Sequence, residues 1–400
     1  MSLRQAPAAP GSHRSAALAG LRLLDLTRLL PGPYTTLILA DLGAEVIKIE
    51  RPGEGDPVRA IPPLLPGGIG ARFAALNHNK KSLALELKAP AGREILFKLV
   101  EQADLIVEGF RPGVAQRLGI DYPAASSVNE SIIYCSLSGF GQDGPYRDRV
   151  GHDINYVGIA GLLSLTGPDQ PTIPGVPIAD LAGGLFAALA ILAALLKRGR
   201  TGQGEFIDLS LTDSALSLMI LHTAELAATG QSPRPEAMVL TGGYACYNIY
   251  RTQDKKYLTV GALEPRFWTA LCRALGREEL IPEQLAPEQR QHELIGELQK
   301  IFAGKSQSEW LSYFQGLNLP VGPVNDLAAA LDDPQIRHRQ RVDRASRSVG
   351  LPFQLGGKPS APAGRAPRLG QHSGEILKAL GYSEARIRAL AAQGIIGLQA

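Results

Sequence analysis

His152, Asp180 and Glu264 are the side chains of this sequence best suited to acid–base chemistry. His152 lies in the run RVGHDINY, just after a glycine-rich loop, and Asp180 precedes a long apolar run. An imidazole and a carboxylate can act as a pair in which one removes a proton and the other returns one. Each residue also has a structural interpretation: an isolated His is commonly hydrogen-bonded within a fold, and Asp before an apolar run is a good helix N-cap. Glu264, in GALEPRF, equally fits an exposed acid at a helix start.

Arginines form a second group of candidates, because a guanidinium pairs with phosphate through two parallel hydrogen bonds. Arg51, Arg59, Arg111 and Arg117 are scattered through the first third of the chain. The formal net charge of +3 over 400 residues is too small to indicate a nucleic-acid partner. The arginines instead suit a small ligand with several phosphates.

Several common sites are excluded by the sequence. The run from Gly139 to Gly144 reads GxGxxG, but Pro145 follows at once and no helix pattern begins there, so a nicotinamide site is not expected. We interpret it as a loop whose glycines let another group approach the backbone. Cys135, Cys246 and Cys272 lie far apart, which predicts three reduced thiols, no metal site and a cytoplasmic protein.

The elements that must position these residues alternate in type along the first half. Apolar runs predict strands at 21–25, 45–50, 82–87, 104–107 and 132–136, with helices at 34–42 and from Pro90 through AGREILFKLVEQA. Strands separated by helix-length connections form parallel sheets with helices on both faces. The expected fold class is therefore α/β, with a parallel sheet that helices cover on both faces.

The stretch after Asp180 is apolar enough to be compared with a membrane span. Its uninterrupted part, residues 181–196, is shorter than the roughly 20 residues that cross a bilayer. Half of it is Ala and Gly, which predicts a helix buried in a large core and no membrane anchor.

The pattern of predicted strands and helices changes near Tyr244. There the run CYNIYRTQDKKYLTVGA predicts a hairpin that turns at Asp254-Lys255, followed by helices. We predict a large domain of residues 18–211 and 332–400, linker helices at 212–243 and a small α+β domain at 244–331. Residues 1–17 are rich in Ala, Pro and Ser and are predicted to be a disordered tail.

Long motifs occur in a fixed order: IKIERPGEGDPVR, LNHNKKSLALELK, VEGFRPGVAQRLGID, SLSGFGQDGPYRDRVGHDINY and KRGRTGQGEFID. From about Leu18 to Ile396 the chain closely resembles the class III coenzyme A transferase (CaiB/BaiF) family. That family includes formyl-CoA transferase, carnitine CoA-transferase and α-methylacyl-CoA racemase. The resemblance implies a large Rossmann-like domain built from both chain ends, a small middle domain, and an interlocked homodimer.

The resemblance also implies catalytic roles. Transferases of the family use an aspartate nucleophile, which matches Asp180 in VPIADLAGG. Racemases use the same Asp with the His of GHDINY, intact here as residues 151–156, and a Glu of GAxEPxF from the partner subunit, matched by Glu264. These motifs favour an acyl-CoA racemase that inverts the α-carbon of a 2-methylacyl-CoA through an enolate. ADLAGG stands where racemases usually read GDFGGG, so a CoA transferase with an aspartyl-CoA intermediate on Asp180 stays open.

The expected substrate is an acyl-CoA, with no prosthetic group and no metal. Backbone N–H groups near Asp153 and the helix start after it are expected to hold the enolate oxygen. A non-catalytic CoA-binding protein is the rival from another class. The residues that the resemblance assigns to coenzyme A binding are Arg51, Asn79, Lys80, Gly109, Phe110, Arg111, Arg117, Gly151, Asp153 and Tyr156.

Overall fold

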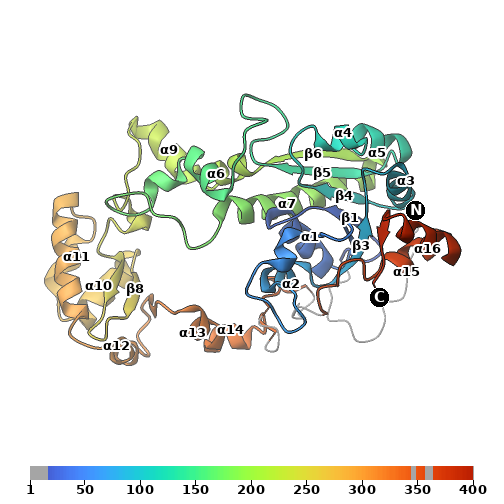
Figure 1. The fold of residues 1–400 in the computed structure, drawn as a ribbon. Helices are drawn as coiled ribbons and strands as arrows, with labels where there is room; N and C mark the ends of the chain where they lie inside the picture. The colour runs from blue at the N-terminus through green and yellow to red at the C-terminus, as the bar shows by residue number, and fades with distance from the viewer. Residues whose placement is uncertain (1–16, 344–347, 356–363, 400) are drawn as a thin grey trace. The chain divides into compact units, whose positions relative to one another are not determined.

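The computed structural model describes residues 17–343, 348–355 and 364–399, and Figure 1 shows its ribbon. The chain divides into two compact units. The first extends to Ala160, resumes at Gly175–Leu218 and includes the chain from Pro334; the second comprises Gly161–Pro174 and Met219–Asp333. The tail predicted for residues 1–17 lies, apart from Ala17, outside the described residues.

A seven-stranded sheet forms the centre of the first unit, in the order β10-β3-β2-β1-β4-β5-β6. Neighbouring strands from β3 to β6 pair in parallel, and only the edge strand β10 runs antiparallel, against β3. The predicted parallel sheet is therefore confirmed. The strand bounds are β1 Arg22–Leu26, β2 Glu45–Glu50, β3 Lys80–Leu85, β4 Leu105–Glu108, β5 Ile133–Ser138, β6 Glu205–Ser210 and β10 Ile396–Gly397.

Helices cover both faces of this sheet. Apolar side chains of α3, α5, α15 and α16 form one core with alternate strand residues such as Leu24 and Ile47, while α1 and α7 contact each other and strands of the sheet. In Figure 1 the C-terminal helices α15 and α16 lie beside strand β3 of the first half. The helix bounds in this unit are α1 Pro31–Asp41, α2 Ala71–Asn77, α3 Pro90–Val100, α4 Val114–Leu118, α5 Tyr122–Val128, α6 Asp153–Ile159, α7 Ile178–Thr201, α8 Leu211–Ser217, α14 Pro334–His338, α15 Ser373–Ala379 and α16 Glu384–Ala392.

Helix α1 begins three residues earlier than predicted, at Pro31 rather than Tyr34. The run Pro31-Gly32-Pro33 forms the first turn of the helix, because proline has the φ angle of a helix and lacks only an N–H that would be unpaired there.

Helix α7 is the one described helix long and apolar enough to cross a membrane by length and composition. One side packs closely: a Cβ on Gly183 would lie 2.2 Å from Leu211 Cδ2, so the Leu211 side chain packs directly against the helix backbone there. The expectation of a fully buried helix is wrong for the other side, where Leu185, Leu189 and Leu196 are 52%, 61% and 74% exposed.

The second unit contains a three-stranded antiparallel sheet, in the order β7-β8-β9. The predicted hairpin is confirmed, with Asp254-Lys255 between β7 and β8 and Lys255 at a φ of 64°. Trp268, Phe302 and Trp310 are buried in the core between sheet and helices. The bounds are β7 Tyr247–Arg251, β8 Tyr257–Gly261, β9 Val321–Pro323, α9 Ile220–Thr229, α10 Pro265–Ala274, α11 Glu288–Phe302, α12 Gln307–Tyr313 and α13 Leu327–Asp332.

Candidate active site

A pocket of about 860 Å³ opens at the carboxyl edge of the parallel sheet, entirely within the first unit. Its walls are the segments that directly follow β1, β4 and β5, together with the loop before α6 and the start of α7. Open α/β sheets bind ligands at this edge, because the loops after the strands meet there. The predicted site residues that line the pocket are Gly109, Phe110, Arg111, Arg117, Gly151, His152, Tyr156 and Asp180.

The glycine-rich loop is shaped by Tyr156. The Tyr156 hydroxyl donates a hydrogen bond to the carbonyl of Gly151 at 2.6 Å. A Cβ on Gly139 would lie 2.5 Å from the Tyr156 ring, and one on Gly151 would lie 2.7 Å from it. The group that approaches the backbone of this loop is therefore the Tyr156 ring, which explains why glycine is needed at both positions.

His152 is the N-cap residue of α6 and is exposed. Its backbone N–H donates to Asn155 Oδ1 at 3.0 Å. Its imidazole makes no hydrogen bond to another residue in the described part of the chain, so the structural interpretation of a tied, buried histidine does not hold. The ring is available to a ligand in the pocket.

Asp180 is the third residue of α7, and Pro177 occupies the N-cap position. The N-cap interpretation of Asp180 is therefore wrong. Its own N–H donates to Asp153 Oδ1 at 3.0 Å, so this donor at the helix start is not free for an enolate oxygen. Burial, and next the nearby Asp153 carboxylate, raise the pKa of Asp180 to about 7. At neutral pH this carboxyl is present in both its acid and its base form.

Cationic side chains also line the pocket. Arg28, Arg111, Arg117, Arg147 and Arg149 all line it. A Cβ on Gly113 would lie 3.2 Å from Arg117 Nη1 and 3.4 Å from Arg147 Nη2, so two guanidinium groups converge beside this glycine.

These arginines differ in their partners. Arg147 contacts Asp148 at 3.2 Å, and Arg149 lies over the Tyr146 ring at 4.8 Å. Within the described ranges, Arg28, Arg111 and Arg117 form no ion pair. Arg117, which has no acidic partner among the described residues, converges with Arg147, and phosphate oxygens can satisfy such neighbouring guanidinium groups.

Glu108, the last residue of β4, supports the turn that carries Gly109 and Phe110 into the pocket. Its Oε2 accepts from Phe110 N at 2.6 Å, and its Oε1 accepts a short hydrogen bond from the Ser136 hydroxyl. Burial raises the pKa of Glu108 to about 7, because desolvation outweighs the two hydrogen bonds and the Asp208 charge adds to it.

Four predicted ligand residues do not lie in this pocket: Arg51, Asn79, Lys80 and Asp153. Arg51 contacts Glu54 at 3.0 Å and Glu86 at 3.5 Å. Asn79 Nδ2 donates to Asp41 Oδ1 at 2.8 Å, and the fully buried Lys80 lies 3.1 Å from Asp25 Oδ2.

Asn79 and Lys80 line a separate cavity of about 930 Å³ instead. The reason is their place in the chain: they stand where β3 begins, and the pocket is built by segments that follow strands. Asn79 and Lys80 therefore do not line the pocket of the other ligand residues, and their assignment to CoA binding stays a prediction.

Glu264 belongs to the second unit, where it is the exposed N-cap residue of α10 and makes no capping bond with its side chain. Its predicted contact with His152, from the partner subunit, stays a prediction. Asp153 does not line the pocket; its Oδ1 accepts the hydrogen bond from the Asp180 N–H.

Comparison with known proteins agrees with this architecture. Residues 18–373 match the model of CoA-transferase family III. The chain belongs to CoA-transferase family III.

Relatives within CoA-transferase family III have different activities. The chain is 36% identical to mouse succinyl-CoA:glutarate CoA-transferase, over 95% of this chain and 90% of that protein. It is 34% identical to human alpha-methylacyl-CoA racemase, over 95% of this chain and 97% of that protein. A CAIB/BAIF family protein from Brucella suis has a similar structure, with a TM-score of 0.82, 31% identity, and coverage of 92% of this chain and 100% of that one.

Sequence reasoning missed three arginines that line the pocket of this family III chain: Arg28, Arg147 and Arg149. A signal was present for Arg28, which follows strand β1 by two residues and so stands at the carboxyl edge. Arg147 and Arg149 lie between the glycine-rich loop and His152, where no periodic pattern indicates which side chains face inward.

Proposed function

We propose that this protein is an acyl-CoA racemase, which inverts the α-carbon of a 2-methylacyl-CoA. The observation that carries the proposal is that His152 and Asp180 line one pocket, with the pKa of Asp180 raised to about 7. Inversion needs one group that takes the α-proton from one face and another that returns a proton to the other face. A carboxyl group with a pKa near neutrality can perform either step.

The proton balance is simple. Ionised Asp180 takes the α-proton, the C–H electron pair moves into the thioester to give an enolate, and protonated His152 returns a proton to the opposite face. For the other enantiomer, neutral His152 takes the proton and protonated Asp180 returns one. Solvent then restores the two protonation states. The partner subunit's copy of Glu264 would orient His152 and stabilise its charged form.

The arginine wall supports coenzyme A as the carrier of the acyl group. CoA has several phosphate groups, which suit the converging Arg117 and Arg147 and the unpaired Arg111. CoA enters as part of the substrate, and we propose no prosthetic group.

We further propose an interlocked homodimer in the cytoplasm. Exposed leucines on α7 and α8, namely Leu185, Leu189 and Leu216, support an interface with a second copy. Three free, buried cysteines support a reducing compartment.

A CoA transferase is the second candidate, favoured by the 36% identity to mouse succinyl-CoA:glutarate CoA-transferase. In that reaction the Asp180 carboxylate attacks the acyl-CoA carbonyl and expels the CoA thiolate, giving a mixed anhydride. The thiolate then attacks the Asp180 carbonyl, releasing the first acid and leaving an aspartyl-CoA thioester. An acceptor carboxylate reverses both steps.

Exchange of the α-hydrogen separates the two candidates. Racemase activity predicts that deuterium from D2O enters the α-position of a 2-methylacyl-CoA without an acceptor acid, and that His152→Ala abolishes inversion of the α-carbon. Transferase activity predicts no exchange, and an Asp180 adduct trapped by hydroxylamine or borohydride and seen by mass spectrometry. A trapped adduct with no α-exchange over a panel of acyl-CoAs would replace the racemase by the transferase.

A further inference from the structure

The segment Thr27–Leu29 forms part of the pocket wall and has a strained backbone. Leu29 has a φ of 68°, in the left-handed region that residues with a Cβ avoid. Its side chain is 46% exposed and lines the pocket together with Arg28. Because such a conformation persists only when its surroundings hold it, some neighbouring group must restrain this segment.

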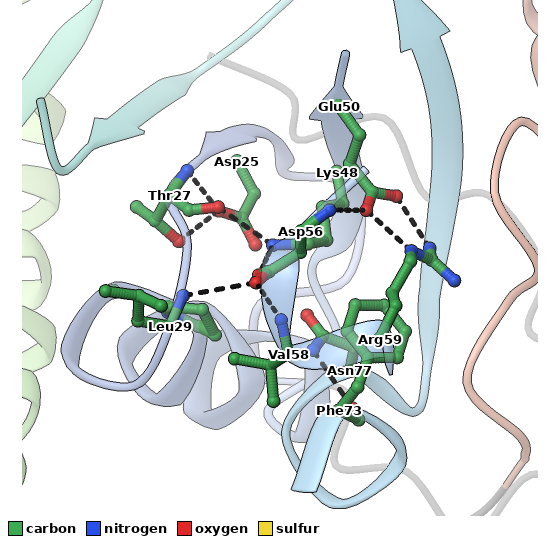
Figure 2. A network of polar contacts seen from close by, with 12 residues as sticks. Asp25, Thr27, Leu29, Lys48, Glu50, Asp56, Val58, Arg59, Phe73 and Asn77 are labelled. Atoms are coloured by element: carbon green, nitrogen blue, oxygen red, sulfur yellow. Dashed lines mark hydrogen bonds and ion pairs between the residues drawn. The ribbon is translucent and has the colours of Figure 1, made fainter. Parts of the chain in front are cut away.

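Two buried charges contact the two ends of that segment. Lys48 Nζ donates to the carbonyl of Thr27 at 2.8 Å. Asp56 Oδ1 accepts from the Leu29 N–H at 3.4 Å, and its Oδ2 lies 3.1 Å from Lys48 Nζ. Figure 2 shows Asp56 between Leu29 and Lys48, with Thr27 on the far side of the ammonium group. The Lys48–Asp56 pair therefore brackets Arg28.

Both ends of this arrangement are anchored further. Thr27 donates from its N–H and its hydroxyl to Asp25 Oδ1, at 2.9 and 2.5 Å. On the other side, Asp56 N donates to Glu50 Oε1 at 3.0 Å, and Asp56 Oδ1 also accepts from Val58 N at 3.1 Å. Lys48 and Asp56 thus connect strand β2 and the turn after it to the pocket wall.

The burial of this pair argues for a positioning role. The side chains of Lys48 and Asp56 are 0% exposed, so neither can touch a ligand. A buried ion pair adds little stability over an apolar pair of similar volume, because both charges lose their hydration. What an apolar pair cannot supply is the hydrogen bond to Thr27 O and the acceptor for Leu29 N.

We propose that the Lys48–Asp56 pair positions the segment Thr27–Leu29, so that Arg28 faces the coenzyme A part of the pocket. Neither residue is catalytic; both act through the backbone of the segment. This inference rests on the proposed function only in taking the pocket as the acyl-CoA site.

The test uses two measurements on the full-length protein. Hydrogen exchange of the amides of residues 27–32, followed by mass spectrometry, reports the segment itself. Calorimetric titration with free CoA reports the pocket. The variants are Lys48→Met, Asp56→Asn and the double variant Lys48→Met/Asp56→Leu, which leaves no buried charge unpaired and is expected to fold even where a single variant does not.

Matched controls come from the ion pair Arg198–Asp104, which joins the end of α7 to the segment before β4. Arg198→Met and Asp104→Asn remove comparable groups from the opposite edge of the sheet. They are expected to leave the exchange of residues 27–32 and the dissociation constant for CoA unchanged.

The expected result is faster exchange in residues 27–32 and a ~10-fold weaker CoA complex in every Lys48 and Asp56 variant, since a displaced wall misplaces Arg28. The inference would be overturned if residues 27–32 of the double variant exchanged as slowly as in the wild type. It would also be overturned if Asp104→Asn weakened CoA binding as much as the Lys48 and Asp56 variants do. If the wild-type protein binds no CoA, the proposed function fails, and the exchange measurement alone decides whether the pair holds the segment.

Discussion

Strand β4 has a carboxylate at each end, and the two have opposite surroundings. Asp104, just before the strand, pairs with Arg198 at 2.9 Å. Glu108, its last residue, has no cationic partner among the described residues, and burial raises its pKa to about 7. The two acids lie only four residues apart along the chain, at opposite ends of β4, and therefore face opposite edges of the sheet.

The cations at the two edges follow the same division. Arg22 and Lys81, at the amino edge, both pair with Glu45, at 2.7 and 2.9 Å. Arg111 and Arg117, at the carboxyl edge, form no ion pair with any described residue. These amino-edge charges compensate one another and hold segments together, whereas Arg111 and Arg117 at the carboxyl edge stay available to a ligand.

The largest effect is expected from Asp180→Asn. An amide of similar shape can neither take nor return a proton, so kcat for inversion of the α-carbon should fall ~10³-fold. The control is Glu45→Gln at the amino edge, which removes a carboxylate from a structural ion pair. Comparable losses in both variants, measured with the same acyl-CoA, would contradict the assignment of chemistry to the carboxyl edge.

A smaller effect is expected when Arg117 and Arg147 are both changed to Ala. Removing two guanidinium groups that converge on one spot should raise the dissociation constant for CoA ~100-fold, about 3 kcal/mol, with kcat nearly unchanged. Titration with CoA and steady-state kinetics separate the two quantities. Arg22→Ala removes one amino-edge guanidinium, and an equal weakening there would show that the division between edges does not govern binding.

The sequence predicted the parallel sheet well, because alternating apolar strands and helices leave few other arrangements. It also brought together His152 and Asp180, which are 28 residues apart but occupy the same pocket. It misplaced Asn79 and Lys80, although the strand order carried the information: both precede most of the predicted strand at 82–87, and residues before a parallel strand lie at the amino edge.

The backbone of Leu29 was beyond sequence reasoning. Left-handed φ angles are expected at Gly or Asn, and a leucine there gives no local signal. Its conformation depends on Lys48 and Asp56, which are 19 and 27 residues further along the chain and meet it only in the folded protein.

Glu108→Gln tests the unpaired carboxylate at the end of β4. Its pKa rises from 4.5 in the unfolded chain to about 7 in the folded protein, so folding disfavours the ionised form. The contribution of Glu108 to the stability of the wild-type protein should therefore be most favourable below pH 4.5. It should be lost as the pH rises through 7. The free energy of unfolding of Glu108→Gln, relative to wild type, should increase by about 2 kcal/mol between pH 5 and pH 8.

Urea unfolding at the two pH values measures this difference. Glu101→Gln, at an exposed position at the end of α3, is the charge-matched control. A relative stability of Glu108→Gln that does not change with pH would mean that Glu108 is compensated after all, and the contrast with Asp104 would disappear.

The smallest effect is expected from Lys81→Ala. Lys81 Nζ pairs with Glu45 at 2.9 Å and Glu375 at 2.8 Å, but its side chain is 35% exposed. Exposed ion pairs contribute little because water and salt screen them, so the free energy of unfolding should fall by about 0.5 kcal/mol and KM for the acyl-CoA should not change. A ~10-fold rise in KM would mean that this amino-edge cation reaches the ligand. The two edges would then share one binding surface, and the paired state of Lys81 would be a feature of the ligand-free protein only.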